Sequence, residues 1–261
     1  MAMGGRAFMS SVERRGTLVV TGGSRGIGAA VARLAAARGH DVVVGYLERG
    51  DAAEAVTRDL SRAGARAVAI RADVAREEEV VRLFEEAARL LGPVAGLATC
   101  AGVTGGFSRV EEVSAATVAR VLAVNVTGTI LCAREALRRM STRRGGGGGA
   151  IVTISSGAAQ LGGAGEWVHY AASKGAVETF TVGLAREVAG EGVRVNAVSP
   201  GLVETELHAA AGDPDRARRL AEGVPLRRPG TAAEIAEGVL WLLSPAASYV
   251  TGTVLRIGGG R

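Results

Sequence analysis

A tyrosine and a lysine four positions apart are the side chains in this sequence best suited to move a proton. Tyr170 and Lys174 lie in the segment Tyr-Ala-Ala-Ser-Lys. In a helix, the two side chains would lie one turn apart on the same face. A nearby ammonium stabilises a phenolate and lowers the pKa of the tyrosine, which makes the phenol useful as an acid or base near neutral pH. Taken alone, the same pair is also typical of an ordinary, partly exposed helix face.

Three polar residues upstream could act with this pair. Ser155 and Ser156 come at the end of a predicted strand, 150–155. Parallel sheets bind ligands at that edge, although paired serines are also common in turns. Asn125 falls within a long helical segment, where asparagine is disfavoured by propensity. This placement indicates a polar role for Asn125, with a solvated asparagine as the alternative.

A glycine-rich segment near the N-terminus has the features of a phosphate-binding turn. Residues 21–28 read Thr-Gly-Gly-Ser-Arg-Gly-Ile-Gly and connect a short apolar run, 17–21, to an amphipathic helical stretch. Glycines there permit a tight turn and let backbone N–H groups approach a pyrophosphate, while the helix N-terminus adds partial positive charge. An ordinary glycine turn is the alternative, but the strand before and the helix after favour dinucleotide binding.

The end of the second predicted strand, 41–45, bears on which dinucleotide binds. An acidic residue at this position would bond the adenosine ribose of NAD. The chain instead reads Val-Gly-Tyr, ending at Tyr46, and Arg25 and Arg49 could meet a 2′-phosphate. The sequence therefore favours NADP(H), and NAD(H) stays open because Glu48 lies close by and could reach a ribose.

Strand-like and helix-like segments alternate along most of the chain, which predicts an α/β fold with a parallel sheet and helices on both faces. Asp73, after the third strand, could accept a hydrogen bond from an adenine amino group or cap the helix near Glu77. The predicted strands are 17–21, 41–45, 66–71, 95–99, 150–155, 193–199 and 253–257. Besides the helix after the glycine turn, the predicted helices are 53–63, 77–91, 117–140, 167–189 and 231–243.

The 261 residues have room for one such domain with a sizeable core. We expect residues 16–261 to form it and residues 1–15 to be a disordered extension. Within the domain, residues 204–225 break the strand–helix rhythm. The five consecutive glycines 145–149 are interpreted as a flexible surface loop rather than a linker, because a strand follows at once.

Composition argues against several classes of partner. Lys and Arg exceed Asp and Glu by 31 to 26, but the arginines are interleaved with glutamates and no basic run carries aromatics, which argues against nucleic acid. Cys100 and Cys132 make neither a disulfide framework nor a metal-ligand spacing, so we expect a reducing cytoplasm and no metal. No apolar run is expected to reach membrane-spanning length, and residues 1–15 lack the apolar stretch of a signal peptide.

In order and spacing, these motifs resemble those of the short-chain dehydrogenase/reductase family over about residues 16–260. The resemblance extends to glucose-dehydrogenase-like and 3-oxoacyl-carrier-protein-reductase-like members. It implies a single Rossmann-type, doubly wound domain with seven parallel strands, in which residues 204–225 form a substrate lid. The motifs that carry it are TGGSRGIG (21–28), Asp73-Val74, Ala101-Gly102, Asn125, Ser155-Ser156, YAASK (170–174), NAVSPG (196–201) and VTGTVLRIGGG (250–260).

The resemblance also implies a role for each matching residue. Tyr170 would be the general acid that protonates a carbonyl oxygen, and the base in the reverse direction. Lys174 would hold the nicotinamide ribose and lower the pKa of the tyrosine. Ser156 would polarise the carbonyl, and Asn125 would hold a water in a proton relay. The implied cofactor-binding residues are Gly22, Ser24, Arg25, Gly26, Ile27, Gly28, Tyr46, Arg49, Asp73, Val74, Ala101, Gly102, Tyr170, Lys174, Pro200, Gly201, Val203 and Thr205.

The implied function is hydride transfer between NADP(H) and a small carbonyl compound or secondary alcohol. The implied assembly is a homotetramer built on the helices 117–140 and 167–189. A dehydratase or epimerase of the same fold and a non-catalytic nucleotide-binding regulator are the alternatives. Trp167 could equally be a core or interface residue. The expected substrate pocket includes residues near Tyr170 and residues of the lid: Gln160, Leu161, Trp167, His169, Leu207, His208 and Leu220.

The sequence departs from the family pattern in two further places. Thr99-Cys100 stands where Asn-Asn often precedes Ala-Gly, a change in a motif that supports cofactor packing. The spacing from Ser156 to Tyr170 is fourteen residues, one more than usual in the family. A longer loop at 162–165 would accommodate it, and Ser155 remains a weaker candidate for the catalytic serine.

Overall fold

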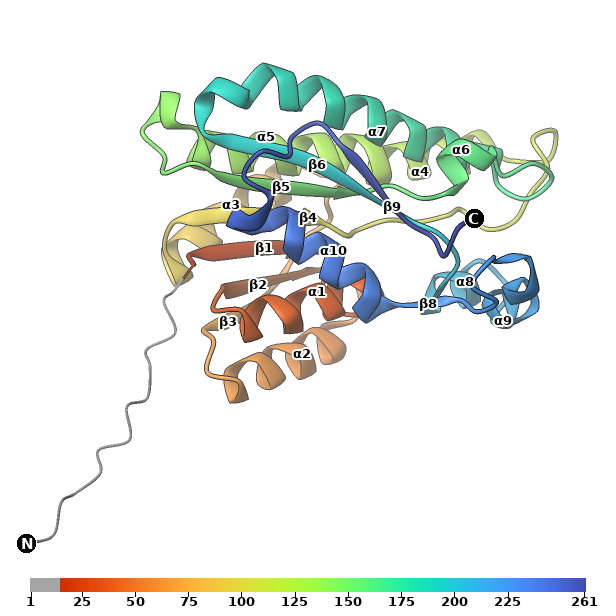
Figure 1. Ribbon diagram of the computed structural model, residues 1–261, viewed down its shortest axis with the longest axis horizontal. Helices are drawn as coiled ribbons and strands as arrows, with labels where there is room; N and C mark the ends of the chain where they lie inside the picture. Colours follow the sequence, from red (N-terminus) through yellow and green to blue (C-terminus); the bar gives the residue numbers. More distant parts are fainter. Residues whose placement is uncertain (1–14) are drawn as a thin grey trace, which may run out of the picture.

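The computed structural model describes residues 15–261, and a seven-stranded parallel sheet runs through its centre (Figure 1). The strand order is β3-β2-β1-β4-β5-β6-β9, so the chain builds the sheet outward from β1 on one side and from β4 on the other. The strands are β1 (Thr17–Thr21), β2 (Asp41–Tyr46), β3 (Ala67–Arg71), β4 (Val94–Thr99), β5 (Gly149–Ile154), β6 (Val193–Pro200) and β9 (Val254–Ile257).

The expected N-terminal extension, 1–15, falls almost wholly outside the described residues. Its last residue, Arg15, is described, and its backbone N–H donates to the carbonyl of Gly39 at 3.0 Å.

Helices cover both faces of the sheet, because successive strand residues point to opposite sides and both sides are apolar. In β1, Leu18 and Val20 pack into one buried cluster with α1, α2 and α10, whereas Val19 packs into a second with α3, α5 and α7. The main helices are α1 (Gly26–Ala37), α2 (Gly50–Arg62), α3 (Glu77–Leu91), α4 (Ala115–Leu122), α5 (Gly128–Met140), α7 (Val168–Val188) and α10 (Ala232–Leu243).

The predicted fold class is confirmed, and all seven predicted strands lie within one residue of their observed bounds at each end. The segment predicted as a lid, 204–225, contains short elements that lie beyond the carboxyl ends of the strands (Figure 1). These are β7 (Val203–Glu204), α8 (Glu206–Ala210), α9 (Arg216–Arg219) and η4 (Ala221–Gly223). A parallel pairing of β7 with β8 (Gly230–Thr231) ties the segment to the start of α10.

The helix predicted over 117–140 is found over 115–140, with one irregularity. A five-residue π-helical turn, η1 (Ala123–Thr127), lies between α4 and α5. Such turns are rare and occur mostly at functional sites. Asn125 lies in this turn, which explains why a residue of poor helix propensity is placed there.

One helical stretch bears on the expectation that no apolar run reaches membrane-spanning length. By length and composition alone, the helical stretch Ala115–Met140 could cross a membrane, with a mean hydropathy of 1.6 over its most apolar window. Helices in the core of a globular protein pass the same test, and this one packs against β4, α3 and α7. Only a third of that window is buried within the chain.

The run of five glycines forms a surface loop, as predicted, and hydrogen bonds tie it to the end of α5. The N–H groups of Gly146 and Gly148 donate to the carbonyls of Ser141 and Met140 at 2.9 and 2.8 Å. Gly148 has a φ of +79°, and a Cβ there would lie 2.6 Å from the carbonyl oxygen of Gly192. The turn thus packs against the loop before β6, and that contact requires glycine.

We expect Gly148→Ala to lower the free energy of unfolding by about 1–3 kcal/mol, since alanine must adopt a left-handed φ and displace backbone. Gly147→Ala is the matched control, because a Cβ at Gly147 meets nothing within 4 Å. Chemical denaturation of the two variants measures the difference. Equal stabilities would show that the turn does not constrain the chain.

Candidate active site

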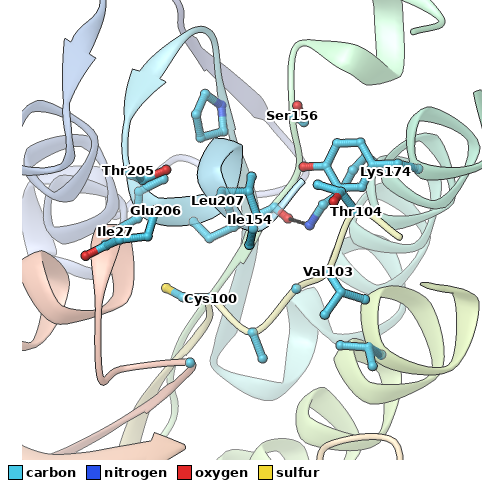
Figure 2. A pocket seen from close by; sticks show the side chains of 18 of the residues that line it. Ile27, Cys100, Val103, Thr104, Ile154, Ser156, Lys174, Thr205, Glu206 and Leu207 are labelled. Atoms are coloured by element: carbon cyan, nitrogen blue, oxygen red, sulfur yellow. Dashed lines mark hydrogen bonds between the residues drawn. The ribbon is translucent and has the colours of Figure 1, made fainter. Parts of the chain in front are cut away.

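A large cavity opens at the carboxyl ends of the strands, between the glycine turn and the segment 204–225 (Figure 2). Its volume is about 980 Å³. All eighteen residues expected to bind a cofactor line this cavity, and so does Ser156. Asn125 is fully buried behind the wall. The topology explains the position: the cavity lies at the switch point between β1 and β4, where the connections leave in opposite directions.

The glycine turn shapes one end of the cavity as a cradle for an anion. Gly22 has a φ of +63°, and a Cβ on Gly28 would lie 2.2 Å from the carbonyl oxygen of Gly22. The helix α1 follows with no acidic residue in its first turn and no side-chain cap from Arg25. Its first N–H groups therefore have no side-chain acceptor and face the cavity end that a pyrophosphate would occupy, so the residues present fit a dinucleotide.

The residues expected to read the adenosine end surround the carboxyl edge of β2. Tyr46 is the last residue of β2, and no carboxylate follows before Glu48. Arg25 and Arg49 are both exposed at the cavity wall. The guanidinium of Arg49 bonds Asp51, with the two nearest atom pairs at 3.2 Å, and this contact raises the pKa of Arg49. Both arginines thus border the place where a 2′-phosphate would lie.

Asp73 does not cap the helix after it. The N-cap of α3 is Arg76, whose side chain accepts no capping hydrogen bond. One carboxylate oxygen of Asp73 accepts from the N–H of Ala75 at 3.0 Å, and the other accepts from Arg120 at 3.2 Å. Asp73 also lines the cavity, so of the two alternatives the adenine contact remains.

Tyr170 lies in the first turn of α7, with its hydroxyl directed toward Ser156 across the cavity. Only 5 % of Tyr170 is exposed. Burial raises the pKa of the phenol to about 12, and a hydrogen bond with the Ser156 hydroxyl opposes this shift. The expected lowering of the tyrosine pKa by Lys174 is therefore not found in the protein alone. The physical reason is that burial penalises the phenolate more than its neighbours stabilise it.

Lys174 follows one turn later on the same helix face, as the spacing predicts. Its Nζ donates to the carbonyl oxygen of Ile154, the last residue of β5, at 2.7 Å (Figure 2). The Nζ lies 5.8 Å from the centre of the Tyr170 ring. Burial lowers the pKa of Lys174 to about 8, so the side chain is still mostly charged at neutral pH. One of its three protons is used by Ile154, which leaves donors for a ligand.

Asn125 anchors the loop that follows β4. Its Oδ1 accepts from the N–H of Val103 and its Nδ2 donates to the carbonyl of Val103, both at 2.9 Å. The Nδ2 also donates to the Ser173 hydroxyl at 3.0 Å. A Cβ on Gly102 would lie 3.4 Å from the Asn125 Oδ1 and 3.6 Å from the Lys174 Nζ, so the glycine leaves open the space between these two groups.

The two serines after β5 have different surroundings. The Ser155 hydroxyl is buried and donates to a carboxylate oxygen of Glu178 at 2.8 Å. The Ser156 hydroxyl lines the cavity and bonds Tyr170. Sequence reasoning ranked Ser156 first but missed Glu178, which also accepts from Gln160 and so holds the start of α6 (Ala158–Leu161). The spacing of Glu178, four residues after Lys174 on α7, is the signal that could have revealed it.

The expected substrate pocket is partly correct. Leu161, Trp167, Leu207, His208 and Leu220 line the cavity. Gln160 and His169 do not line it: Gln160 bonds Glu178, and a ring nitrogen of His169 bonds the carbonyl of Thr104 at 2.9 Å.

Sequence reasoning missed three residues at this end of the cavity. The Phe107 ring stacks on Trp167 with 4.8 Å between ring centres, and Arg216 pairs with Glu166. No motif marks these positions, because their chain segments are brought together only by the fold. Among residues 15–261, no cluster of three or more His, Cys, Asp or Glu side chains could hold a metal ion.

The amino-acid sequence is similar to those of known oxidoreductases. Residues 22–261 match the family model described as enoyl-(acyl carrier protein) reductase. An uncharacterized oxidoreductase, YgfF of Escherichia coli (strain K12), is 46 % identical over 243 residues, which cover 93 % of this chain and 98 % of that protein. The cis-4-hydroxycyclohexanecarboxylate dehydrogenase of Sinomonas cyclohexanicum is 40 % identical over 256 residues, 98 % of each chain.

A solved structure agrees with these relatives. A short-chain type dehydrogenase/reductase from Mycobacterium marinum superposes with a TM-score of 0.88, at 32 % identity and with 95 % of each chain covered. The likeness extends over nearly the whole fold described above. The chain is therefore a member of the short-chain dehydrogenase/reductase family, oxidoreductases that use NAD(P)(H).

Proposed function

We propose that this enzyme transfers a hydride between NADP(H) and a small carbonyl compound or secondary alcohol, with Tyr170 as the general acid or base. The observation that carries the proposal is that Ser156, Tyr170 and Lys174 line one end of a cavity whose opposite end is the glycine cradle of residues 22–28. When bound, the nicotinamide supplies or accepts the hydride. The residues of the chain bind and orient the cofactor and the substrate, and they move the proton.

Tyr170 and Ser156 are suited to hold a carbonyl oxygen between two hydroxyl groups. A phenol with a pKa of about 12 stays protonated at neutral pH, so Tyr170 has a proton to give. As negative charge develops on the substrate oxygen, Tyr170 transfers that proton and Ser156 stabilises the oxygen by a hydrogen bond. The protonated phenol favours the reducing direction, and the reverse direction requires that the phenolate be stabilised.

We assign that stabilisation to Lys174 once the cofactor and substrate are bound. Its ammonium is the cationic side chain directed at the Tyr170 ring, 5.8 Å from its centre. We assign to Lys174 the binding of the nicotinamide ribose hydroxyls through its remaining donors. Asn125 positions this end of the site through Val103, and we assign to it a water in the relay to Lys174. The space beside Gly102, between Asn125 and Lys174, supports this assignment.

NADP(H) is proposed over NAD(H) on the chemistry of the adenosine end. Two exposed guanidinium groups, Arg25 and Arg49, border the cavity where β2 ends without a carboxylate. A 2′-phosphate would form charge-assisted hydrogen bonds with them. The carboxylate of Glu48 lies at the same wall and would oppose the phosphate.

We also propose that the enzyme works in the cytoplasm as a homotetramer. Two apolar side chains on the half-covered helical stretch 115–140 support the assembly, Leu122 at 41 % and Ile130 at 39 % exposed. A second copy would cover them. We expect sedimentation velocity to give a tetramer-sized particle, and a monomer-sized species at micromolar concentration would contradict the proposal.

Tyr170→Phe should lower the turnover of carbonyl substrates with NADPH by about a hundredfold to ten-thousandfold, because the proton donor is lost. Cofactor binding, measured by NADPH fluorescence, should persist. Tyr249→Phe is the matched control, since Tyr249 is fully exposed away from the cavity. Substantial activity of Tyr170→Phe would refute the assignment. Tight NADPH binding by the wild type without turnover of any carbonyl would instead favour a regulator.

Arg49→Ala should raise the KM for NADPH by about tenfold and leave the KM for NADH nearly unchanged, because only NADPH carries the phosphate that Arg49 would bind. Arg58→Ala serves as the control, because Arg58 is an exposed arginine of the following helix that pairs with Glu54. Steady-state kinetics with the two cofactors in parallel measure the effect. A wild-type preference for NADH would overturn the cofactor assignment and implicate Glu48.

A further inference from the structure

A partly buried ion pair connects the segment 204–225 to the loop before α7 at the substrate end of the cavity. The two terminal nitrogens of Arg216, in α9, donate to the two carboxylate oxygens of Glu166 at 2.6 and 2.5 Å. The Arg216 side chain is 6 % exposed and that of Glu166 is 38 % exposed. Both line the cavity. Glu166 thus uses both terminal nitrogens of a guanidinium that lies at the substrate end.

Aromatic rings fix this guanidinium close to the reacting phenol. It lies 4.8 Å from the centre of the Trp167 ring and 5.2 Å from that of Phe107. Trp167 is in turn 5.3 Å from the Tyr170 ring. The Arg216 Nε is buried and has no hydrogen-bond partner among residues 15–261. The pair is therefore held one ring away from Tyr170, within reach of the far end of a small substrate.

The other charged groups near the pair contribute little net charge. His208 stacks on Trp167 at 6.4 Å, and its pKa is lowered, mainly by burial and further by the Arg216 charge, so it is neutral at pH 7. Asp213 pairs with Arg219. Arg261 lies exposed at the rim, where solvent screens it. The charges of Arg216 and Glu166 cancel beside the Trp167 ring, and the ammonium of Lys174 lies on the far side of Tyr170, where Ile154 accepts one of its protons.

We propose that Glu166 acts as an internal carboxylate that occupies Arg216 and so makes the site selective for uncharged substrates over carboxylates. The inference rests on the proposed function and names its substrate class, a neutral ketone or secondary alcohol. A substrate carboxylate that took the two terminal nitrogens of Arg216 would displace Glu166 and leave that carboxylate unpaired beside it. Such displacement is costly because a partly buried charge loses its partner.

A similar dehydrogenase bears the name of a carboxylate substrate, cis-4-hydroxycyclohexanecarboxylate. The inference therefore separates this enzyme from that relative. If Arg216 were a receptor for substrate carboxylates, the same guanidinium would give the opposite selectivity.

The test compares wild type with Glu166→Gln, which keeps the shape of the side chain and removes its charge. Binding of cyclohexanecarboxylate and of its uncharged analogue cyclohexanecarboxamide is measured by calorimetry on the enzyme saturated with NADP⁺. We expect wild type to bind the amide in preference to the carboxylate. Glu166→Gln should bind the carboxylate about tenfold or more tightly than wild type does, because the guanidinium is released. Asp215→Asn, which breaks the exposed pair with Arg218, should change neither affinity.

Two results would overturn the inference. One is a wild type that binds the carboxylate at least as tightly as the amide, and the other is an unchanged carboxylate affinity in Glu166→Gln. The double variant Glu166→Gln/Arg216→Met removes both charges and should lose the gained carboxylate affinity. It also serves if Glu166→Gln alone fails to fold, because a neutral pair leaves no buried charge. In that case, tight carboxylate binding by the double variant would contradict the inference.

A turnover measurement separates this inference from the function on which it rests. Wild type should reduce cyclohexanone with NADPH at a kcat/KM at least about tenfold above that for 4-oxocyclohexanecarboxylate. Reduction of neither compound, nor of other carbonyls, would refute the proposed function, while the calorimetry would still decide the role of Glu166. Equal kcat/KM values would refute the selectivity alone.

Discussion

The burial of one ammonium group, that of Lys174, is the constraint on which the site depends. Taking a charge out of water costs several kcal/mol unless its protons find acceptors. The carbonyl of Ile154 meets this need, because β5 ends where α7 passes over it. The room beside the Nζ comes from Gly102, which has no side chain to fill it. A strand end, a loop and a helix must all be in register for the lysine to be tolerated.

The parallel sheet supplies that register. Strands that all run in one direction end at one edge, so β1, β4 and β5 deliver the glycine turn, Gly102 and Ser156 to the same face of the domain. The π-helical turn adds the remaining piece, because it turns the Asn125 amide onto Val103 and fixes the loop after β4. The energetic cost of burying polar groups is thus offset by hydrogen bonds that also position the reacting groups.

The lid is joined to this rigid part by contacts of a different kind. The short pairing of β7 with β8 joins it to the start of α10, and its contact with the loop before α7 runs through Arg216 and Glu166. The Arg216 guanidinium also lies against the ring of Trp167, a residue that immediately precedes α7. The ion pair therefore couples the position of the lid to the aromatic wall beside Tyr170.

The sequence by itself determined the strands and their alternation with helices. Apolar patterning and glycine placement are local signals, and they act through backbone geometry that any fold must obey. Most of the residues expected to bind the cofactor were predicted from motifs that resemble those of the family, and they line the cavity. The sequence also predicted that Tyr170 and Lys174 share a helix face, since that follows from helical periodicity alone.

Only the tertiary structure decided the direction of the pKa shifts and the contacts at the substrate end of the cavity. The pKa of Tyr170 depends on burial by segments far away in the chain, so local spacing gave the wrong direction of shift. The π-helical turn at Asn125 and the hydrogen bonds of the glycine loop 145–149 depend on which backbone groups lie opposite them. The pair of Arg216 with Glu166 joins residues fifty positions apart, and no periodicity in the sequence records such a contact.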